Sequence, residues 1–376
     1  MIYLDNAATS FPKPRRVITE ICRCMTHYCA NPGRSGHDMA AKMASNIYET
    51  RETIAEFFNI QNPLRIVFTS NATEALNLAI KGLLKPGDHV VTTAMEHNSV
   101  LRPLKELGGI RISVVPASKE GKVSAEGIRA AINSSTSMVI CTHSSNVTGT
   151  IQPIKEIGAI CRKNNVLFMV DASQSAGIIP IDVEKNNIDI LACPGHKSLF
   201  GPQGTGFLYV RPGLHPIPLR SGGTGTDSAN LNQPRYLPEG CEAGTQNGPG
   251  IIGLREGIRF INDTGISAIR EREIHICGLL LEELLNMPKI LVYGPANQSE
   301  KTAVVSFNIK GTDCESTADQ LNRHFGIAAR AGYHCAPLAH KAIGTFGEGA
   351  VRLSPGAFTT EEEIIKTVNA IRKISG

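Results

Sequence analysis

Short apolar segments of strand length alternate with amphipathic segments of helix length over the first two thirds of this chain. Parallel strands need a crossover connection, usually a helix, so this alternation predicts a parallel sheet covered by helices on both faces. The predicted strands are 65–68, 89–92, 112–115, 138–141, 166–170, 188–192 and 206–210. The predicted helices include 72–82, 124–131, 154–163 and 251–261. We therefore predict the α/β fold class.

The pattern changes after a glycine- and proline-rich segment, 212–250, which we interpret as long ordered loops. Beyond it the sequence predicts a helix over 266–285, a strand over 302–308, a helix over 314–325 and a final helix beginning near Thr360. Thr360 and Glu363 have the spacing of a capping box. We predict three parts: an N-terminal segment (1–14), a large domain (15–255) and a smaller α+β domain (256–376).

Composition excludes several classes of protein. The chain has 376 residues, of which 41% are hydrophobic, enough for a substantial core. Its formal net charge is only +4 and no basic run is interleaved with aromatic residues, so nucleic-acid binding is not expected. We find neither a basic leader nor an apolar stretch of about 18 residues, so we expect no membrane partner and a cytoplasmic location.

The ten cysteines are scattered along the chain without paired C-x-x-C spacing. The scattered positions support neither a zinc ribbon nor a disulfide framework, and we predict no metal site. Most of the cysteines are expected to be small buried hydrophobic residues in a reducing compartment.

A lysine and an acid point to a cofactor. The apolar run 167–170 ends on Asp171, with Gln174 just beyond, and Lys197 follows in the turn Gly195-His196-Lys197. Taken singly, a lysine is more often a solvated surface residue, and an acid at the end of a strand is common. Together they are typical of a Schiff-base lysine and of an acid that pairs with a pyridinium nitrogen, which indicates pyridoxal phosphate.

An anion site is predicted where strand 65–68 runs into a helix beginning at Ala72 and Thr73. The free backbone N–H groups of a helix N-terminus favour phosphate. The alternative is that Asn71 and Glu74 only cap the helix. No Walker spacing is present, so a nucleotide triphosphatase is disfavoured.

Two further side chains follow predicted strands, where ligands gather in open α/β sheets. His97 follows strand 89–92, and Asn146 follows strand 138–141. We predict that His97 is catalytic, stacking on a ring and moving protons; the alternative is that a single histidine in such a place is more often an exposed loop residue. Their agreement with the lysine, acid and phosphate elements favours one shared site.

Eight motifs, in order along nearly the whole chain, resemble those of the cysteine desulfurase family. They are Tyr-Leu-Asp-Asn-Ala-Ala-Thr at 3–9, Thr-Glu at 73–74, Met-Glu-His at 95–97, Ser-Asn-Val-Thr-Gly at 145–149, Val-Asp-Ala-Ser-Gln at 170–174, Gly-His-Lys at 195–197, Glu-Ala-Gly-Thr at 242–245 and Arg-Ala-Gly-Tyr-His-Cys-Ala at 330–336. The last resembles the Suf-type group. The resemblance implies a class V aminotransferase of fold-type I, with a mainly parallel seven-stranded sheet in the large, cofactor-binding domain.

The resemblance also implies a role for each matching residue. Lys197 would form the Schiff base, Asp171 would pair with the pyridine nitrogen, Gln174 would contact the ring oxygen and His97 would stack on the ring. The phosphate would be held by Ala72, Thr73 and His196 of one subunit and by Thr245 of the partner subunit. This arrangement implies a homodimer with shared sites. Asn146 lies at the cofactor and, with Arg330 and Arg352, would bind the substrate carboxylate near Ala7 and Ala8. A guanidinium matches a carboxylate in bidentate fashion.

Cys335 stands where the family keeps its sulfur-accepting nucleophile. The implied reaction transfers sulfur from L-cysteine to this thiol as a persulfide and releases L-alanine. We expect His334 and Arg330 to lower the pKa of the thiol. A sulfur- or selenium-acceptor protein is a further expected partner.

The chain departs from the Suf-type pattern at Pro194, where that group has serine, at Tyr333, where it has histidine, and over 337–341. Proline can donate neither a hydroxyl nor an N–H to a phosphate. A selenocysteine lyase acting on L-selenocysteine is the principal alternative function. An ordinary transaminase and a cysteine-rich thiol or metal sensor are weaker alternatives.

Overall fold

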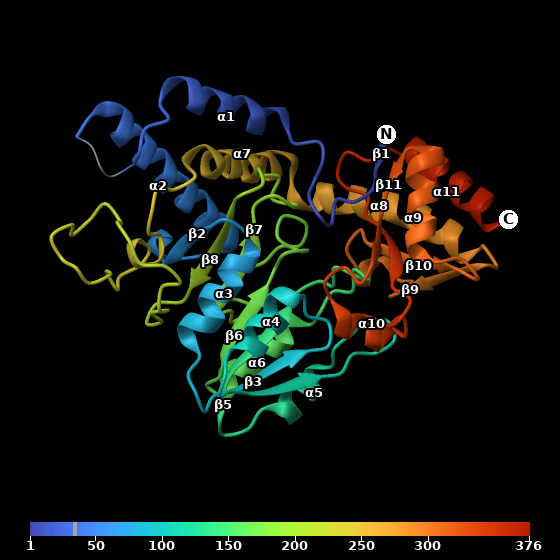
Figure 1. Ribbon diagram of the computed structural model, residues 1–376, viewed down its shortest axis with the longest axis horizontal. Coiled ribbons are helices and arrows are strands. Elements are labelled where there is room, and N and C mark those ends of the chain that lie inside the picture. Colours follow the sequence, from blue (N-terminus) through green and yellow to red (C-terminus); the bar gives the residue numbers. More distant parts are fainter. Residues whose placement is uncertain (33–35) are drawn as a thin grey trace.

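The computed structural model describes residues 1–32 and 36–376, and its largest element is a seven-stranded sheet (Figure 1). The strands lie in the order β2-β8-β7-β6-β5-β3-β4. Their bounds are β2 (Ile66–Thr69), β3 (His89–Thr93), β4 (Arg111–Val115), β5 (Thr136–Thr142), β6 (Leu167–Asp171), β7 (Ile190–Pro194) and β8 (Gly206–Val210). β8 pairs antiparallel with β2 and with β7, and the other described pairs of this sheet are parallel, so the mainly parallel sheet is confirmed.

Helices cover both faces of this sheet. They are α1 (Arg15–His27), α2 (Asp38–Phe58), α3 (Ala72–Leu83), α4 (Asn98–Glu106), α5 (Ala125–Ala131), α6 (Ile154–Lys163) and α7 (Gly248–Thr264). Successive side chains of a strand point to opposite faces. Accordingly Met138 packs in the core under α3 and α4, and Val139 packs in the core under α2, α6 and α7. The predicted two-faced α/β arrangement is confirmed.

A second, antiparallel sheet has the order β12-β13-β10-β9 and belongs to the C-terminal part of the chain. Its strands are β9 (Ile290–Tyr293), β10 (Val305–Ile309), β12 (Arg330–Gly332) and β13 (Ala350–Leu353); β1 (Ile2–Tyr3) pairs separately with β11 (Ile327–Ala328). The helices are α8 (Ile266–Leu285), α9 (Cys314–Phe325), α10 (Pro337–Ile343) and α11 (Glu361–Ser375). Short 3₁₀ helices occupy Pro63–Arg65, Glu239–Cys241 and Gln298–Glu300. No helix in the described ranges combines the length and apolarity needed to cross a bilayer.

The division into three domains remains a prediction. Residues 255 and 256 both lie inside α7, which continues to Thr264, so the predicted boundary falls within a helix. The N-terminal segment associates with the C-terminal part, because β1 pairs with β11 and Leu4 is buried among apolar side chains of α8 and α11. The predicted capping box of the last helix is present at Thr360 and Glu363.

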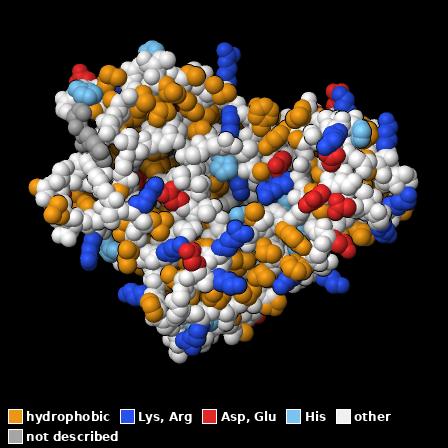
Figure 2. Space-filling model, in the orientation of Figure 1, with side chains coloured by type: hydrophobic (Ala, Val, Ile, Leu, Met, Phe, Trp, Pro, Cys, Tyr) orange, Lys and Arg blue, Asp and Glu red, His pale blue; other side chains and the backbone are white. Residues whose placement is uncertain are grey.

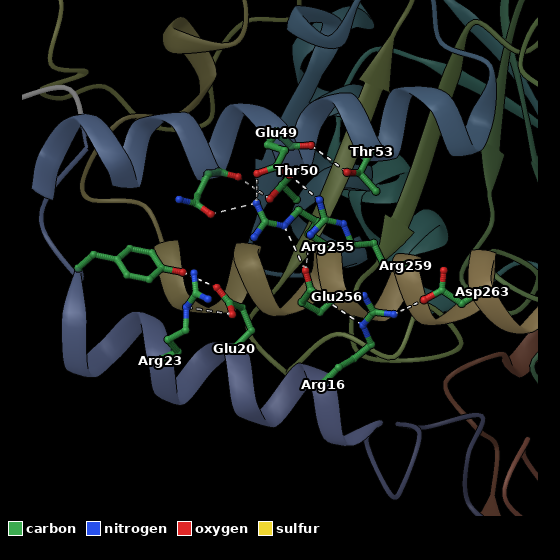
Figure 3. A network of polar contacts seen from close by, with 12 residues as sticks. Arg16, Glu20, Arg23, Glu49, Thr50, Thr53, Arg255, Glu256, Arg259 and Asp263 are labelled. Atoms are coloured by element: carbon green, nitrogen blue, oxygen red, sulfur yellow. Dashed lines mark hydrogen bonds and ion pairs between the residues drawn. The ribbon is translucent and has the colours of Figure 1, made fainter. Parts of the chain in front are cut away.

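Partly buried ion pairs fasten α1 and α2 to α7 (Figure 3). Arg255 and Arg259 of α7 both contact the Glu49 carboxylate on α2, and Arg16 of α1 lies 3.0 Å from Glu256. Arg255 and Glu256 are themselves buried, so loss of their partners would leave a buried charge uncompensated. The same helix approaches the chain just beyond Lys197: a Cβ at Gly257 would lie 2.1 Å from the carbonyl oxygen of Leu199. The network therefore fixes a helix that supports the candidate site.

Candidate active site

A cavity of about 80 Å³ opens at the carboxyl ends of β5, β6 and β7, beside the N-termini of α3 and α4. Eight of the predicted site residues line it: Ala72, Thr73, His97, Asn146, Asp171, Gln174, His196 and Lys197. They come from five separate segments of the chain: 72–73, 97, 146, 171–174 and 196–197. Their convergence fits the rule that ligands bind at the carboxyl edge of parallel strands.

Lys197 lies in a tight turn after β7. The Gly195 N–H donates to the Thr205 carbonyl at 2.8 Å, and the Gly201 N–H donates back to the Gly195 carbonyl at 2.8 Å. Glycine is required at 195, since a Cβ there would lie 2.3 Å from the Thr205 hydroxyl. Burial lowers the pKa of Lys197 to about 8, with Asp171 opposing this effect and Arg352 and Arg330 adding to it. A lysine with a lowered pKa is more readily a neutral nucleophile.

Asp171 ends β6 and is buried. Its Oδ1 accepts hydrogen bonds from the backbone N–H and the hydroxyl of Ser173, the first at 2.9 Å. This clamp orients a carboxylate that also lines the cavity. A buried carboxylate in such a place favours a cationic N–H partner.

The N-terminus of α3 supplies donors at the other end of the cavity. Asn71 caps the helix by accepting from the Glu74 N–H at 2.9 Å, and the Glu74 carboxylate accepts from the Ser70 N–H at 2.7 Å. The capping explanation is therefore correct, but it leaves the first N–H groups of the helix, at Ala72 and Thr73, without an intrahelical partner. The buried Nδ1 of His196 also has no hydrogen-bond partner among the described residues. These groups could bind an anion together.

His97 is not an exposed loop residue, because it caps α4 and lines the cavity. Its Nδ1 accepts from the Ser99 N–H at 3.0 Å, which places the proton of the neutral ring on Nε2. Burial lowers the pKa of His97 to about 4, and the charge of Asp171 opposes this shift only in part. The ring is therefore neutral near pH 7 and suited to stacking.

The N-terminal segment closes one side of the site. Gln174 Nε2 donates to the Ala7 carbonyl at 2.9 Å, and the Ala8 N–H donates to the Asp5 carbonyl at 3.0 Å. Arg352 is buried, donating to the Asn146 carbonyl at 3.0 Å and to Asp5 Oδ1 at 2.6 Å. Asp5 thus holds the guanidinium that we predicted to bind a substrate carboxylate.

Cys335 is exposed on a loop that touches the rim of the cavity. Its carbonyl accepts from the Asn98 N–H at 2.7 Å, and the preceding carbonyl, of His334, accepts from Asn146 Nδ2 at 2.6 Å. Arg330 Nη2 lies 3.7 Å from Sγ. The thiol of the predicted nucleophile is therefore beside a fixed positive charge.

His334 brings no positive charge to the Cys335 loop. The His334 ring is buried, and burial together with the nearby charge of Arg352 lowers its own pKa to about 2. A neutral ring supplies no positive charge, and its hydrogen bonds go to His340 and to the Arg330 carbonyl. Of the two predicted neighbours, only Arg330 contacts the sulfur.

Thr245 lies outside this cavity within its own chain. It is exposed in a turn, 242–246, whose Glu242 carboxylate accepts from the Phe68 N–H at 2.6 Å and pairs with the buried Arg51. The turn is thus held against β2, and Thr245 itself projects to the surface. A contact between Thr245 and a cofactor would require a second subunit.

Comparisons with known proteins agree with this geometry. A family model described as aminotransferase class-V matches residues 2–366. A probable cysteine desulfurase from Methanothermobacter thermautotrophicus is 36% identical, with 100% of this chain and 95% of the relative covered. This chain belongs to the class-V aminotransferase family, in its cysteine desulfurase branch.

Solved structures of cysteine desulfurases superpose closely on this member of the family. The apo enzyme from Thermococcus onnurineus NA1 has a TM-score of 0.94 at 33% identity and covers 100% of this chain and 94% of its own. The cysteine desulfurase CsdA from Escherichia coli, as its S-sulfonic acid, has a TM-score of 0.89 at 25% identity, covering 99% and 94%. The fold of a class-V aminotransferase, predicted from the motifs, is confirmed.

Several residues of this class-V site were missed by the sequence analysis. Ser99 hydrogen-bonds Thr73 Oγ1 at 2.8 Å, and Lys13 Nζ donates to the His196 carbonyl at 2.7 Å. Asp5, which pairs with Arg352, lies inside the motif at 3–9, and membership of that motif was the one sign of its importance in the sequence. Pro194 lines the cavity, so the departure from the Suf-type serine lies at the site itself.

Proposed function

We propose that this chain is a pyridoxal-phosphate-dependent cysteine desulfurase that converts L-cysteine to L-alanine and receives the sulfur on Cys335 as a persulfide. One observation carries the proposal: Lys197 and Asp171 share a cavity, and the Cys335 loop is hydrogen-bonded to Asn146, which lines it, and to Asn98, which lies between the lining residues His97 and Ser99. An ordinary transaminase has no use for such a thiol.

The residues present fit the cofactor. Lys197 would hold its aldehyde carbon, Asp171 its pyridine nitrogen, Gln174 its ring oxygen and His97 its ring face. The phosphate would meet the N–H groups of Ala72 and Thr73, the Thr73 hydroxyl and the free Nδ1 of His196. When bound, pyridoxal phosphate supplies an electron sink at the substrate α-carbon.

The chain's own side chains would perform the remaining tasks. Arg352, Arg330 and Asn146 would bind the substrate carboxylate near Ala7 and Ala8, with the substrate displacing Asp5 from Arg352. The Cys335 thiolate would attack the substrate Sγ: an S–S bond forms, the C–S bond breaks and its electron pair stays on the carbon fragment, which is protonated and leaves as alanine. One L-cysteine and one thiol thus give one L-alanine and one persulfide.

The direct test is a paired assay with L-cysteine and L-selenocysteine. With pyridoxal phosphate and a thiol reductant, the purified protein is expected to turn yellow and to release alanine and sulfide from L-cysteine in equal amounts. A strong preference for L-selenocysteine would instead identify a selenocysteine lyase. Protein that stays colourless in this assay contradicts the proposal and fits the sensor alternative; alanine without sulfide would also contradict it.

We propose a cytoplasmic homodimer, which would pass its sulfur to an acceptor protein. Free cysteines throughout the described ranges suit a reducing compartment. Large apolar side chains are exposed over α1, where Ile18 is 53% and Met25 64% accessible (Figure 2). The segment between β8 and α7, yellow in Figure 1, projects from the body and exposes Ile217 and Leu231. Exposed apolar patches of this kind favour association with another subunit.

Sharing of the two sites predicts complementation. Lys197→Ala chains and Thr245→Asp chains, each of which we expect to be inactive as a homodimer, are coexpressed with different tags and the hybrid is purified. One site of the hybrid then combines native Lys197 with native Thr245 of the partner subunit. We expect about half of the wild-type activity per dimer, since one of two sites is intact. A hybrid as inactive as both parents would show that the sites are not shared; Thr245→Ser, which keeps the hydroxyl, is the control.

A further inference from the structure

A histidine of the Cys335 loop, His334, stacks on a histidine of α10, His340. The rings of His334 and His340 are 5.6 Å apart at an angle of 17°, and both residues are buried. His334 Nδ1 lies 3.4 Å from His340 Nε2, and His340 Nδ1 lies 2.7 Å from the Thr345 hydroxyl. His340 is in α10, a segment where the sequence departs from the Suf-type pattern.

The hydrogen bonds of this pair have one consistent direction. His334 Nε2 lies 3.4 Å from the Arg330 carbonyl, which can only accept, so this nitrogen carries a proton. Nδ1 of the neutral His334 ring is then an acceptor, and His340 Nε2 donates to it. His340 Nδ1 accepts in turn from the Thr345 hydroxyl. Each ring nitrogen is therefore satisfied when both rings are neutral, as their burial requires.

The Cys335 loop needs such support because its backbone is strained. His334 and Cys335 have φ values of 51° and 58°, in the left-handed region that side chains other than glycine seldom adopt. Asn146 and Asn98 hold the two carbonyl groups of the loop. The only hydrogen bond that His334 Nδ1 makes within the described ranges comes from His340. The Tyr333 ring packs edge-on against His340 with centroids 5.3 Å apart.

We propose that His340 is a positioning residue for the nucleophile: by fixing the His334 ring, it holds Cys335 in the strained conformation that presents Sγ beside Arg330 and the rim of the cavity. This inference rests on the proposed function, because positioning matters only if Cys335 attacks the substrate sulfur. Elimination of selenium depends less on that attack, since the carbon–selenium bond is weaker than the carbon–sulfur bond. The two substrates therefore separate positioning from general damage.

The test compares His340→Ala, His340→Gln and the control His324→Ala, an exposed histidine of α9. For His340→Ala we expect kcat with L-cysteine to fall about 10- to 100-fold with little change in KM, because small misplacements of reacting groups cost this much. Alanine formation from L-selenocysteine and the visible absorbance should stay within about twofold. Glutamine retains an N–H donor for His334 Nδ1 and should recover most of the loss.

Equal losses on both substrates, or an unchanged kcat with L-cysteine, would overturn the proposal. If His340→Ala does not fold, Thr345→Val decides, since it removes only the hydroxyl that donates to His340. For Thr345→Val we expect a smaller fall in kcat with L-cysteine, again with little change on L-selenocysteine. A second readout does not need activity: the rate of Cys335 alkylation by iodoacetamide, measured by mass spectrometry, should differ at least about threefold between His340→Ala and wild type. An unchanged rate contradicts the positioning role, whereas wild-type protein that forms no alanine contradicts the proposed function.

Discussion

Replacing Cys335 with alanine is expected to lower alanine formation from L-cysteine about 10³-fold or more, because removal of a catalytic nucleophile has effects of at least this size. The same variant should retain much of its alanine formation from L-selenocysteine and the yellow colour of the bound cofactor. Alanine, sulfide and selenide are measured for both substrates under saturating conditions. The ratio of alanine formation from L-cysteine to that from L-selenocysteine shows how strongly the reaction depends on the Cys335 thiol.

The fold should tolerate this substitution. Cys335 is exposed, and alanine carries the same Cβ, so it meets the same backbone restriction at a φ of 58°. The control is Cys22→Ala, which removes another exposed thiol, on α1, and should leave activity on L-cysteine unchanged. If Cys335→Ala keeps full activity on L-cysteine, the persulfide mechanism is wrong.

Local signals in the sequence predicted much of the scaffold. The bounds of α6, α8, α9 and β8 match the predicted ranges, and the capping box at Thr360 lies where its spacing indicated. Hydrophobic periodicity and caps act within a few residues, so one sequence contains them. The strand predicted at 302–308 begins only at Val305, because the Thr302 N–H pairs instead with the Gly149 carbonyl of a distant loop.

The parts of the site that depend on distant contacts were not predicted. Asp5 pairs with Arg352 across 347 positions of sequence, and α10 was not expected at all. His97 caps a helix that the sequence analysis did not predict, α4. The burial of His334 was not predicted for the same reason: adjacency in sequence gives neither the direction of a side chain nor its burial.

Replacing Lys197 with alanine is the second change with a large expected effect. Activity on both amino acids should fall about 10³-fold or more, because the variant lacks the amine that would hold the cofactor and move protons at the substrate α-carbon. Borohydride reduction followed by mass spectrometry should attach the cofactor to the peptide containing Lys197 in wild type and to no peptide in the variant. Unlike Cys335→Ala, this variant should lose activity on L-selenocysteine as well.

The stability of the cofactor-free variant provides an independent check. Burial lowers the pKa of Lys197 from 10.5 to about 8, so folding places a charge where the cavity disfavours it. This penalty is fully present below pH 8 and disappears as the pH rises from about 8 to 10.5. Lys197→Ala should therefore unfold at the same or a higher urea concentration than wild type at pH 7, with the difference shrinking above pH 8. A lower midpoint at pH 7 would contradict this account of the buried amine.

A matched lysine distinguishes Lys197 from its surroundings. Burial also lowers the pKa of Lys13 to about 8, and its amine lies 2.7 Å from the carbonyl of His196, one residue before Lys197. Lys13 does not line the cavity, however, so Lys13→Met should still trap the cofactor on residue 197. If borohydride trapped the cofactor on Lys13 in wild type or in Lys197→Ala, a lowered pKa beside the site would be enough for attachment. Attachment to Lys197 alone would mean that position within the cavity, opposite Asp171, selects the reactive amine.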